Sequence, residues 1–595
     1  MAVAFLYIVL VIKPAFYFHH SQAPFLLDKH FLMDYTDYPG GISEWISNLV
    51  MQGFYSRVAG PPVFFVMALC IYLLSRGILN RIRPDRFNVV LALLPFTFSI
   101  VIANNYTLPY QVIISSILVF LFTWIFCRTM EKALAGLLMI LAGTMVIFYV
   151  SGTGYLLLYG ILVLSVTLVR LSYRNVPYIL FSFIMVAMIP FLAGKIVFKD
   201  LPPPGYLDFF REVVEFKAYY PSLTFYMLLI SMPLLASGIG LYPAFKKITP
   251  GLKLSPVLKT IVMAGTILVF TAFSHFETFI PDARRIVASD YYCLHLDARK
   301  VAKAATNIEN YHFGANLNYN LAMAKAGRLN EDFFNFFQVT GANVLYPDLE
   351  FSSELVFISA DFYYDLGYIC EARHWAYEAL VFYPYSPRAL RLLVKIHLVT
   401  GEYKAAERTL FILEKGIINR KFTREYEPLV RDTSLVYSNS EIMSGRRSMP
   451  GSHELDPYII SRFMELLEKN PENTRAYEYL MLYFILDGDL ENFLEYYKLA
   501  GKYFDRPVGI YEEAILMYGF LNHIDVKEEY DISAESLARF DAYLEILEKH
   551  KNDVRMARNE LYWKMGNTCL YYLQFVEPRV ILPEITDPDH EEPQI

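Results

Sequence analysis

The feature that most constrains this chain is a series of apolar stretches, each close to the length of a membrane span, that fills its first 274 residues. Nine stretches occur, at 2–18, 58–79, 87–103, 109–127, 133–151, 153–170, 177–197, 222–243 and 257–274. An α-helix needs about 20 mostly apolar residues to cross the hydrocarbon core of a bilayer. The pattern therefore predicts a polytopic membrane domain of about nine helices, with the lipid bilayer as its first partner.

Charge divides the chain near the same point. Residues 1–274 carry 19 Lys and Arg against 10 Asp and Glu, a net charge of +9, whereas the remainder carries 34 against 50, a net charge of −16. The second part is also patterned as helices, so we expect it to face water. We predict an all-α protein with a transmembrane helical domain at 1–274, which includes a loop at 19–57, and a soluble helical domain at 275–595 that ends in an acidic tail.

Cations lie in alternate connections between the apolar stretches. They follow the second, fourth, sixth and eighth stretches, as Arg81, Arg83, Arg86, Arg128, Lys132, Arg170, Arg174, Lys246, Lys247, Lys253 and Lys259. The short connections at 104–107 and 151–154 contain no Lys or Arg, and the longer one at 199–221 is mixed. Because Lys and Arg favour the cytoplasmic side, we predict a multi-pass protein of the inner (plasma) membrane with its C-terminal domain outside, in the periplasm of a Gram-negative cell.

The first apolar stretch has a second interpretation. It is short and contains Lys13 and Pro14, and a cleaved signal peptide that ends near residue 23 would also explain it. Both interpretations place residue 24 and the loop that follows outside.

The second part of the chain contains an internal repeat. Gly367 and Gly401 are 34 residues apart, and a 17-residue interval separates a proline from a glycine at both 384–401 and 471–488. A 34-residue period is the tetratricopeptide signature, and residues 350–505 resemble degenerate repeats of this kind, in which Gly would let paired helices approach closely. We interpret the polar stretch at 431–457 as an inserted loop.

Such a solenoid exposes a concave surface, so its expected partner is a protein or a peptide. No basic face or stripe suggests nucleic acid. The five cysteines show neither a CxxC motif nor the spacing of a metal site, so we predict neither a zinc site nor a disulfide framework. Nothing in the sequence indicates a particular cofactor.

The loop at 19–57 contains the turn DYTDYPGG and then an amphipathic pattern. Apolar residues recur at steps of three and four after Gly41, with polar residues between them: Ile42, Trp45, Ile46, Leu49, Val50 and Phe54 against Glu44, Ser47 and Gln52. We expect a helix that lies in the membrane interface on its apolar face.

Asp34 and Asp37 in this turn are the candidate catalytic residues. Carboxylates beside a bilayer could act as general bases, or could hold a divalent cation. The competing interpretation is that both acids simply support a Pro-Gly corner through local backbone bonds. An acidic first outer loop resembles, in layout, the GT-C glycosyltransferases, which would imply a lipid-linked sugar donor.

Two stretches carry a resemblance in sequence: YPGGISEWISNLVMQGFYSR at 38–57 and NLNYNLAMAKAGRLNEDFFNFFQ at 316–338. Both resemble a domain-of-unknown-function family of multi-pass inner-membrane proteins from Bacteroides-type bacteria. The resemblance implies architecture and location, and it assigns no activity.

Three functions remain open from the sequence. The first is a GT-C-like transferase that moves a sugar from a polyprenyl-phosphate donor. The second is a non-enzymatic scaffold whose membrane half anchors a repeat domain that recruits an envelope partner. A transporter is favoured least, because no acid lies within an apolar stretch to form a proton relay.

Overall fold

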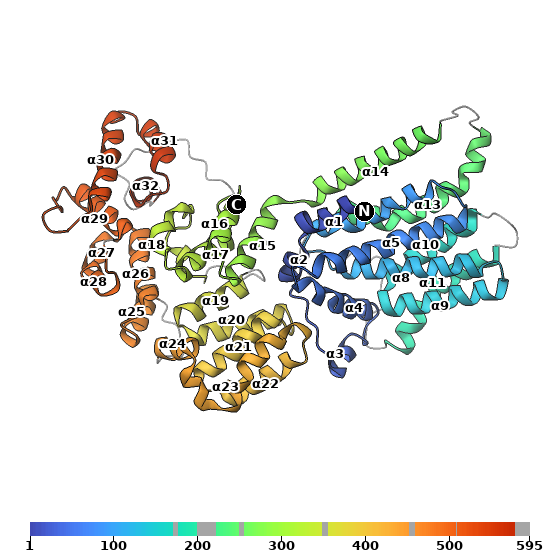
Figure 1. Cartoon of the computed structure of the whole chain (residues 1–595), viewed down its shortest axis with the longest axis horizontal. Coiled ribbons are helices and arrows are strands. Elements are labelled where there is room, and N and C mark those ends of the chain that lie inside the picture. The colour runs from blue at the N-terminus through green and yellow to red at the C-terminus, as the bar shows by residue number, and fades with distance from the viewer. Residues whose placement is uncertain are drawn as a thin grey trace. The chain divides into compact units, whose positions relative to one another are not determined.

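A computed structural model of the chain describes residues 1–169, 176–198, 222–248, 255–347, 355–450, 458–506 and 508–576. Every regular element in these ranges is a helix, and no strand occurs among them, so the all-α prediction is confirmed. The connection at 199–221 and the acidic tail lie outside the described residues. The chain divides into two compact units, which Figure 1 draws together: residues 1–281 with 411–423, and residues 282–410 with 424–595.

Each of the nine apolar stretches is helical in the first unit. Its helices are α1 (Ala2–Tyr7), η1 (Ile8–Ile12), α2 (Pro14–Ser21), α3 (Lys29–Asp34), α4 (Gly41–Met51), η2 (Gln52–Tyr55), α5 (Gly60–Ile82), α6 (Asn88–Leu91), α7 (Leu93–Val101), η3 (Ile102–Asn104), α8 (Gln111–Thr129), α9 (Ala133–Ser151), α10 (Thr153–Val169), α11 (Val176–Ile196), α13 (Leu223–Ile248) and α14 (Pro256–Thr278). Six of them, α5, α8, α9, α11, α13 and α14, are long and apolar enough to cross a membrane.

The first apolar stretch is bent. Its two parts, Ala2–Ile12 and Pro14–Ser21, meet at 44°, because Lys13 adopts a left-handed backbone with φ of 50° and Pro14 starts the next helix. The Tyr106 hydroxyl donates to the Ile12 carbonyl at 3.0 Å. That bond satisfies a carbonyl that the bend frees from the helix.

Four hydroxyl side chains inside the apolar helices bond their own backbone. Each donates to the carbonyl four residues earlier, at 2.7 to 2.9 Å: Ser116, Thr123, Thr144 and Thr167. These buried polar groups are thereby satisfied where water is absent. Small residues also allow close contact, since a Cβ at Gly143 of α9 would lie 2.6 Å from the hydroxyl oxygen of Tyr159 on α10.

Glu277, in the last turn of α14, caps the start of α13. Its carboxylate accepts the Leu223 N–H at 2.6 Å, the Thr224 N–H at 3.1 Å and the Thr224 hydroxyl at 2.5 Å. The exposed N–H groups of a helix N-terminus attract negative charge. This acid therefore has a structural role in joining two apolar helices.

The second unit consists of short helices, several of which pack as consecutive pairs, such as α19 with α20 and α26 with α27. They are α15 (Pro281–Leu294), α16 (Ala298–Ala305), α17 (Phe313–Lys325), α18 (Leu329–Asp332), η5 (Phe333–Asn335), η6 (Gly341–Leu345), α19 (Val356–Leu366), α20 (Ile369–Phe382), α21 (Pro387–Thr400), the first part of α22 (Tyr403–Glu414), the second part of α23 (Arg420–Arg431), η8 (Thr433–Ser438), α24 (Ser440–Ser448), α25 (Ile459–Lys469), α26 (Thr474–Asp487), α27 (Leu490–Tyr497), α28 (Ala500–Tyr503), α29 (Gly509–Asn522), α30 (Ala534–Lys549), α31 (Val554–Met565) and α32 (Cys569–Phe575). The end of α22, η7 (Ile417–Asn419) and the start of α23 belong to the first unit.

The repeated glycines end three helices of this unit. Gly367, Gly401 and Gly488 have φ of 107°, 78° and 70°, and each follows directly on α19, α21 or α26. Glycine adopts this left-handed conformation without the penalty of a Cβ. Nothing lies within 4 Å of a Cβ built at Gly401. Glycine is therefore required at this position by its backbone angle. The close approach of a second helix, which we expected from the sequence, is not the reason.

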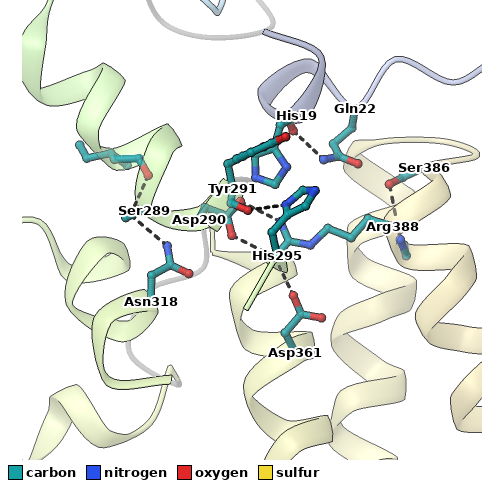
Figure 2. Close-up of polar contacts among 12 residues, drawn as sticks. His19, Gln22, Ser289, Asp290, Tyr291, His295, Asn318, Asp361, Ser386 and Arg388 are labelled. Atoms are coloured by element: carbon teal, nitrogen blue, oxygen red, sulfur yellow. Dashed lines mark hydrogen bonds and ion pairs between the residues drawn. The ribbon is translucent and has the colours of Figure 1, made fainter. Parts of the chain in front are cut away.

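Two arginines at equivalent positions of the pairs bind the same helix. Arg388 in the first turn of α21 bonds Asp361 of α19 at 2.6 Å and Asp290 of α15 at 2.7 and 3.0 Å, as Figure 2 shows. Arg475 in the first turn of α26 forms an ion pair with Asp365 of α19. Asp361 and Asp365 are one helical turn apart and share a face. Helix α19 therefore fixes the register of both pairs.

The prediction of an inserted loop at 431–457 is wrong for the first half of this range. Residues 433–438 form η8 and residues 440–448 form α24, while 451–457 lie outside the described residues. The Asn439 side chain caps α24 by accepting the Ile442 N–H at 3.1 Å. Arg446 of α24 donates to the Leu398 and Val399 carbonyls at 2.7 and 3.0 Å. A polar residue of α24 thus binds the end of α21. The polar composition of this stretch therefore resembled that of a loop.

Candidate functional site

The two candidate catalytic acids lie on the surface of the first unit. Asp34 is the last residue of α3, and Asp37 lies in the turn that follows; both are exposed. Neither side chain has a hydrogen bond or an ion pair with the described part of the chain. The structure thus leaves both carboxylates accessible to solvent, in one turn of the loop at 19–57, which we call the first loop.

Gly40 attaches this turn to the ends of two long helices. Its N–H donates to the Tyr149 carbonyl of α9 at 3.0 Å, and its carbonyl accepts Nε2 of Gln111, at the start of α8, at 2.9 Å and the Ser43 hydroxyl at 2.8 Å. Gly40 has φ of 99°, a backbone angle that favours glycine. The corner at 39–41 is therefore a fixed point of the helix bundle.

The helix predicted after this corner is present, but its environment differs from the expected one. Ser47 and Gln52, which we expected to point away from the packed face, are buried, as is Asn48. The Gln52 side chain donates to the Ala23 carbonyl at 3.1 Å and to the Asn48 carbonyl at 2.9 Å. Helix α4 packs against α8 and α9, so its polar groups form bonds inside the protein.

Two apolar side chains of α4, Trp45 and Leu49, pack against a cluster formed by the first loop itself. Phe25, Leu26, Phe31 and Tyr35 form a buried cluster against which further apolar side chains pack: Tyr38, Trp45, Leu49, Ile412 and Ile417. The ring centroids of Phe25 and Trp45 are 5.2 Å apart. Trp45 and Leu49 of the predicted stripe therefore pack against a small folded module, whereas Ile42, Ile46 and Val50 are half-buried outside this cluster.

Part of this module comes from far along the chain. Residues 411–423 belong to the first unit and contribute Ile412 and Ile417 to the cluster. The Leu27 N–H donates to the Lys415 carbonyl at 2.8 Å. The Lys415 ammonium lies 2.5 Å from Oδ2 of Asp28. We call residues 411–423 the returning segment.

Asp28 has a structural role in this arrangement. Its Oδ1 accepts the N–H groups of His30 at 2.8 Å and Phe31 at 3.4 Å, which caps the start of α3. The hydrogen bond from Lys415 lowers the pKa of Asp28, with the backbone bonds adding to the effect. Asp28 thus differs from the two candidate acids of the turn, because it is paired with Lys415, whereas Asp34 and Asp37 have no ion pair with the described part of the chain.

Glu44 is a carboxylate that the sequence interpretation did not single out. It lies in the first turn of α4, and its Oε2 accepts the Tyr38 hydroxyl at 2.7 Å. Burial raises the pKa of Glu44, although the Tyr38 bond lowers it in part. A tyrosine six residues before a glutamate, across a Pro-Gly-Gly turn, is the sequence signal that could have paired them.

Histidines of the first loop do not gather into a metal site. His19 is buried and its carbonyl accepts Nε2 of Gln22 at 2.6 Å, whereas His30 is exposed. Within the ranges that the structure describes, no group of three His, Cys, Asp or Glu side chains could hold a metal ion. The groups on this surface that could take part in a reaction are the exposed carboxylates of Asp34 and Asp37.

Comparison with known proteins identifies one family to which the chain is similar. No curated protein and no solved structure matches the chain. A family profile described as a family of unknown function, DUF6057, matches residues 1–576. That range includes the first loop, the apolar helices, the returning segment and the described helices of the second unit, and the chain therefore belongs to this family.

Proposed function

We propose that this chain is a membrane-anchored scaffold of the cell envelope, whose first unit holds a helical domain that binds a protein or peptide. Nine crossings are part of the proposal. Six helices are long and apolar enough to cross a membrane. The bent first pair would be the seventh crossing, and the shorter apolar helices at 88–104 and 153–169 would be the eighth and ninth. The alternate cations then place the second unit outside, on the periplasmic side of an inner membrane.

The observation that carries the proposal is the returning segment. A loop built to admit a lipid-linked substrate would leave space beside its acids, but this loop packs its apolar residues around Ile412 and Ile417. It also uses Asp28 to hold Lys415. The first loop therefore serves as a binding seat for another part of the chain.

The helical domain, as a degenerate tetratricopeptide-like solenoid, offers a surface suited to a partner. On α20, Tyr377 and Val381 lie one turn apart with 48% and 72% of their surface exposed. Exposed neighbouring apolar side chains mark protein-binding surfaces. We assign the partner contact to this strip.

The test is chemical cross-linking in native membranes that contain the full chain, followed by purification and quantification of the attached protein. A stoichiometric partner is expected with the wild type, and Tyr377→Ser combined with Val381→Ser should reduce its recovery at least tenfold. Leu499→Ser, a change at another exposed apolar residue, is the matched control and should retain the partner. Partner-free isolation of the wild type would contradict the scaffold proposal.

A second candidate function is supported by the exposure of Asp34 and Asp37 on a turn that is fixed to α8 and α9. This is a GT-C-like transfer of sugar from a polyprenyl-phosphate donor, with Asp34 or Asp37 as general base. Replacement of both by Asn should abolish a glycan of the envelope, and Asp505→Asn, at an exposed acid of the second unit, should leave it unchanged. Unaltered glycans in the double variant would exclude this function.

A further inference from the structure

The corner between α15 and α16 has a fixed backbone. The Leu296 N–H donates to the Cys293 carbonyl at 3.1 Å, and the Asp297 N–H donates to the Tyr292 carbonyl at 3.0 Å. These two bonds form a Schellman motif, in which the residue that leaves the helix takes a left-handed backbone. Leu296 is that residue, with φ of 54°. The Asp297 side chain then caps α16 by accepting the Lys300 N–H at 3.3 Å.

Leucine is an unfavourable residue at this position. The left-handed conformation brings the Cβ of an ordinary residue close to a carbonyl oxygen, a penalty that glycine avoids. Three other helices of the same unit, α19, α21 and α26, are followed at this point by Gly367, Gly401 and Gly488. Packing inside the protein does not compensate Leu296, because 72% of its surface is exposed. Its side chain is therefore available to contact something outside the chain.

Helix α16 presents two cations beside this leucine. Arg299 and Lys303 are exposed and lie one helical turn apart. Val301 and Ala305 point to the opposite side, because successive residues turn by 100°, and they are buried. Neither cation forms an ion pair with the part of the chain that the structure describes. Both charges therefore face solvent.

The local charge contrasts with that of the domain around it. Residues 293–307 contain three Lys and Arg residues against one acid, a net charge of +2, whereas residues 275–595 together carry −16. Leu294, at the end of α15, adds a second exposed apolar side chain, with 43% of its surface accessible. Apolar side chains beside cations suit the surface of an anionic bilayer, where the former enter between headgroups and the latter attract phosphate.

A bilayer lies within reach of this corner. Helix α14, which is long and apolar enough to cross a membrane, ends at Thr278, and α15 begins at Pro281. The 14 residues of α15 extend about 20 Å at 1.5 Å per residue. The headgroup layer adds only about 5–7 Å to each side of the hydrocarbon core. The corner therefore touches the bilayer when α15 lies along its surface.

We propose that Leu294, Leu296, Arg299 and Lys303 form a surface that binds anionic phospholipid, which we call the lipid corner. The leucines enter the interface and the two cations bind lipid phosphates. The occupant is the bilayer, because the same chain carries six helices able to cross one. The fixed backbone favours binding, since a preorganised corner loses little freedom on contact. The lipid corner does not depend on the scaffold function.

The test is electron paramagnetic resonance of a nitroxide at Leu296→Cys, in the full chain with its native cysteines replaced by Ala or Ser. The chain is placed in nanodiscs of phosphatidylcholine and phosphatidylglycerol. The ratio of accessibility to oxygen, which dissolves in lipid, and to a nickel chelate, which dissolves in water, should be at least threefold higher than for a label at Leu499→Cys, another exposed leucine of the second unit. Equal ratios would overturn the proposal. Shielding of the first label from both reagents would also overturn it, because protein would then cover the corner.

A second arm tests the cations. Arg299→Gln combined with Lys303→Gln should lower the ratio for the label at position 296 at least twofold, and nanodiscs of phosphatidylcholine alone should have the same effect on the unsubstituted cations. Lys498→Gln combined with Lys502→Gln is the matched control, because both lysines are exposed and one turn apart elsewhere in the unit. It should leave the ratio unchanged. A ratio that responds neither to the cations nor to lipid charge would refute their role.

Leu296→Gly separates lipid binding from folding. Glycine suits the left-handed backbone, so this variant should unfold in detergent at the same temperature as the wild type or higher. In nanodiscs, photo-cross-linking of residues 293–303 by a diazirine-bearing phosphatidylglycerol should fall at least threefold. A lower unfolding temperature or unchanged cross-linking would contradict the proposal, because the leucine would then serve the fold alone.

Discussion

Asp28 and Lys415 are 387 positions apart in the sequence, and their side chains form an ion pair at 2.5 Å. The pair joins the first loop to the returning segment inside one compact unit. It lies beside the buried aromatic cluster of the loop and beside the backbone bond from Leu27 to Lys415. The loop that the sequence marked as a possible active site is therefore held by a segment near the middle of the second half of the chain.

Acid should loosen this attachment. The pKa of Asp28 is lowered in the folded protein by Lys415 and by the backbone bonds, so its stabilising contribution is present above the pKa of an unfolded aspartate and is lost as pH falls through the folded value. Proteolytic cleavage of the first loop in the full chain should increase as pH falls below the pKa of an unfolded aspartate, about 4. Asp28→Asn should be cleaved readily already at neutral pH, and a wild-type cleavage rate that is independent of acid would contradict the prediction.

Gly41→Ala should destabilise the first unit. A Cβ at this position would lie 2.3 Å from the Tyr35 carbonyl oxygen, and overpacking of this kind costs about 1–3 kcal/mol. Thermal unfolding in detergent, followed by circular dichroism, measures the effect. Gly265→Ala is the control, because nothing lies within 4 Å of its Cβ, and it should be neutral or slightly stabilising. Equal melting temperatures for the two variants would refute the geometry of the corner.

The two equivalent arginines should differ in energetic weight. Arg388→Met leaves the carboxylates of Asp290 and Asp361 without their buried cation and should cost about 3–5 kcal/mol of unfolding free energy. Arg475→Met removes a pair whose arginine side chain is 34% exposed and should cost about 1 kcal/mol or less. Chemical denaturation of the full chain in detergent compares them, and a larger loss for Arg475→Met would show that the assignment is reversed.

Glu478 should make the second unit less stable as pH rises. Burial raises its pKa from 4.5 to about 7, and its Oε1 accepts one hydrogen bond, from Asn330 at 3.1 Å. The neutral acid suits the fold, so its contribution is complete below pH 4.5 and is lost as pH rises through the folded pKa. Glu478→Gln should remove this dependence and gain roughly 3 kcal/mol above pH 7. Unfolding titrations at pH 4.5 and pH 8 test it, and a parallel pH profile for the two proteins would disprove it.

The sequence predicted the helices better than their surroundings. The apolar stretches became helices because their length and composition leave few alternatives in a bilayer, and Gly367, Gly401 and Gly488 marked true helix ends. The physical reason was different from the expected one, since at Gly401 the backbone angle alone requires glycine. Periodicity locates a helix end well, but it does not distinguish a steric need from a conformational one.

The first loop shows what periodicity cannot reveal. The stripe of α4 was correct as a pattern, and no local signal indicated that residues 411–423 would help to cover it. The burial of Gln52 likewise depends on the Ala23 carbonyl, which comes from another segment. A contact between residues hundreds of positions apart is invisible in a single sequence, so the pairing of Asp28 with Lys415 could not be predicted from the pattern.

The most direct test of the central claim, that the returning segment is seated on the first loop, is a cross-link between Asp28→Cys and Lys415→Cys in the full chain. The five native cysteines have no disulfide partner among the described residues and would be replaced by Ala or Ser. In native membranes, a short bis-methanethiosulfonate reagent should join the two new thiols in most molecules, as identified by mass spectrometry of the linked peptides, and neither single-cysteine chain should form the link. Failure of the double variant to cross-link, with both thiols reactive toward a monofunctional reagent, would contradict the account.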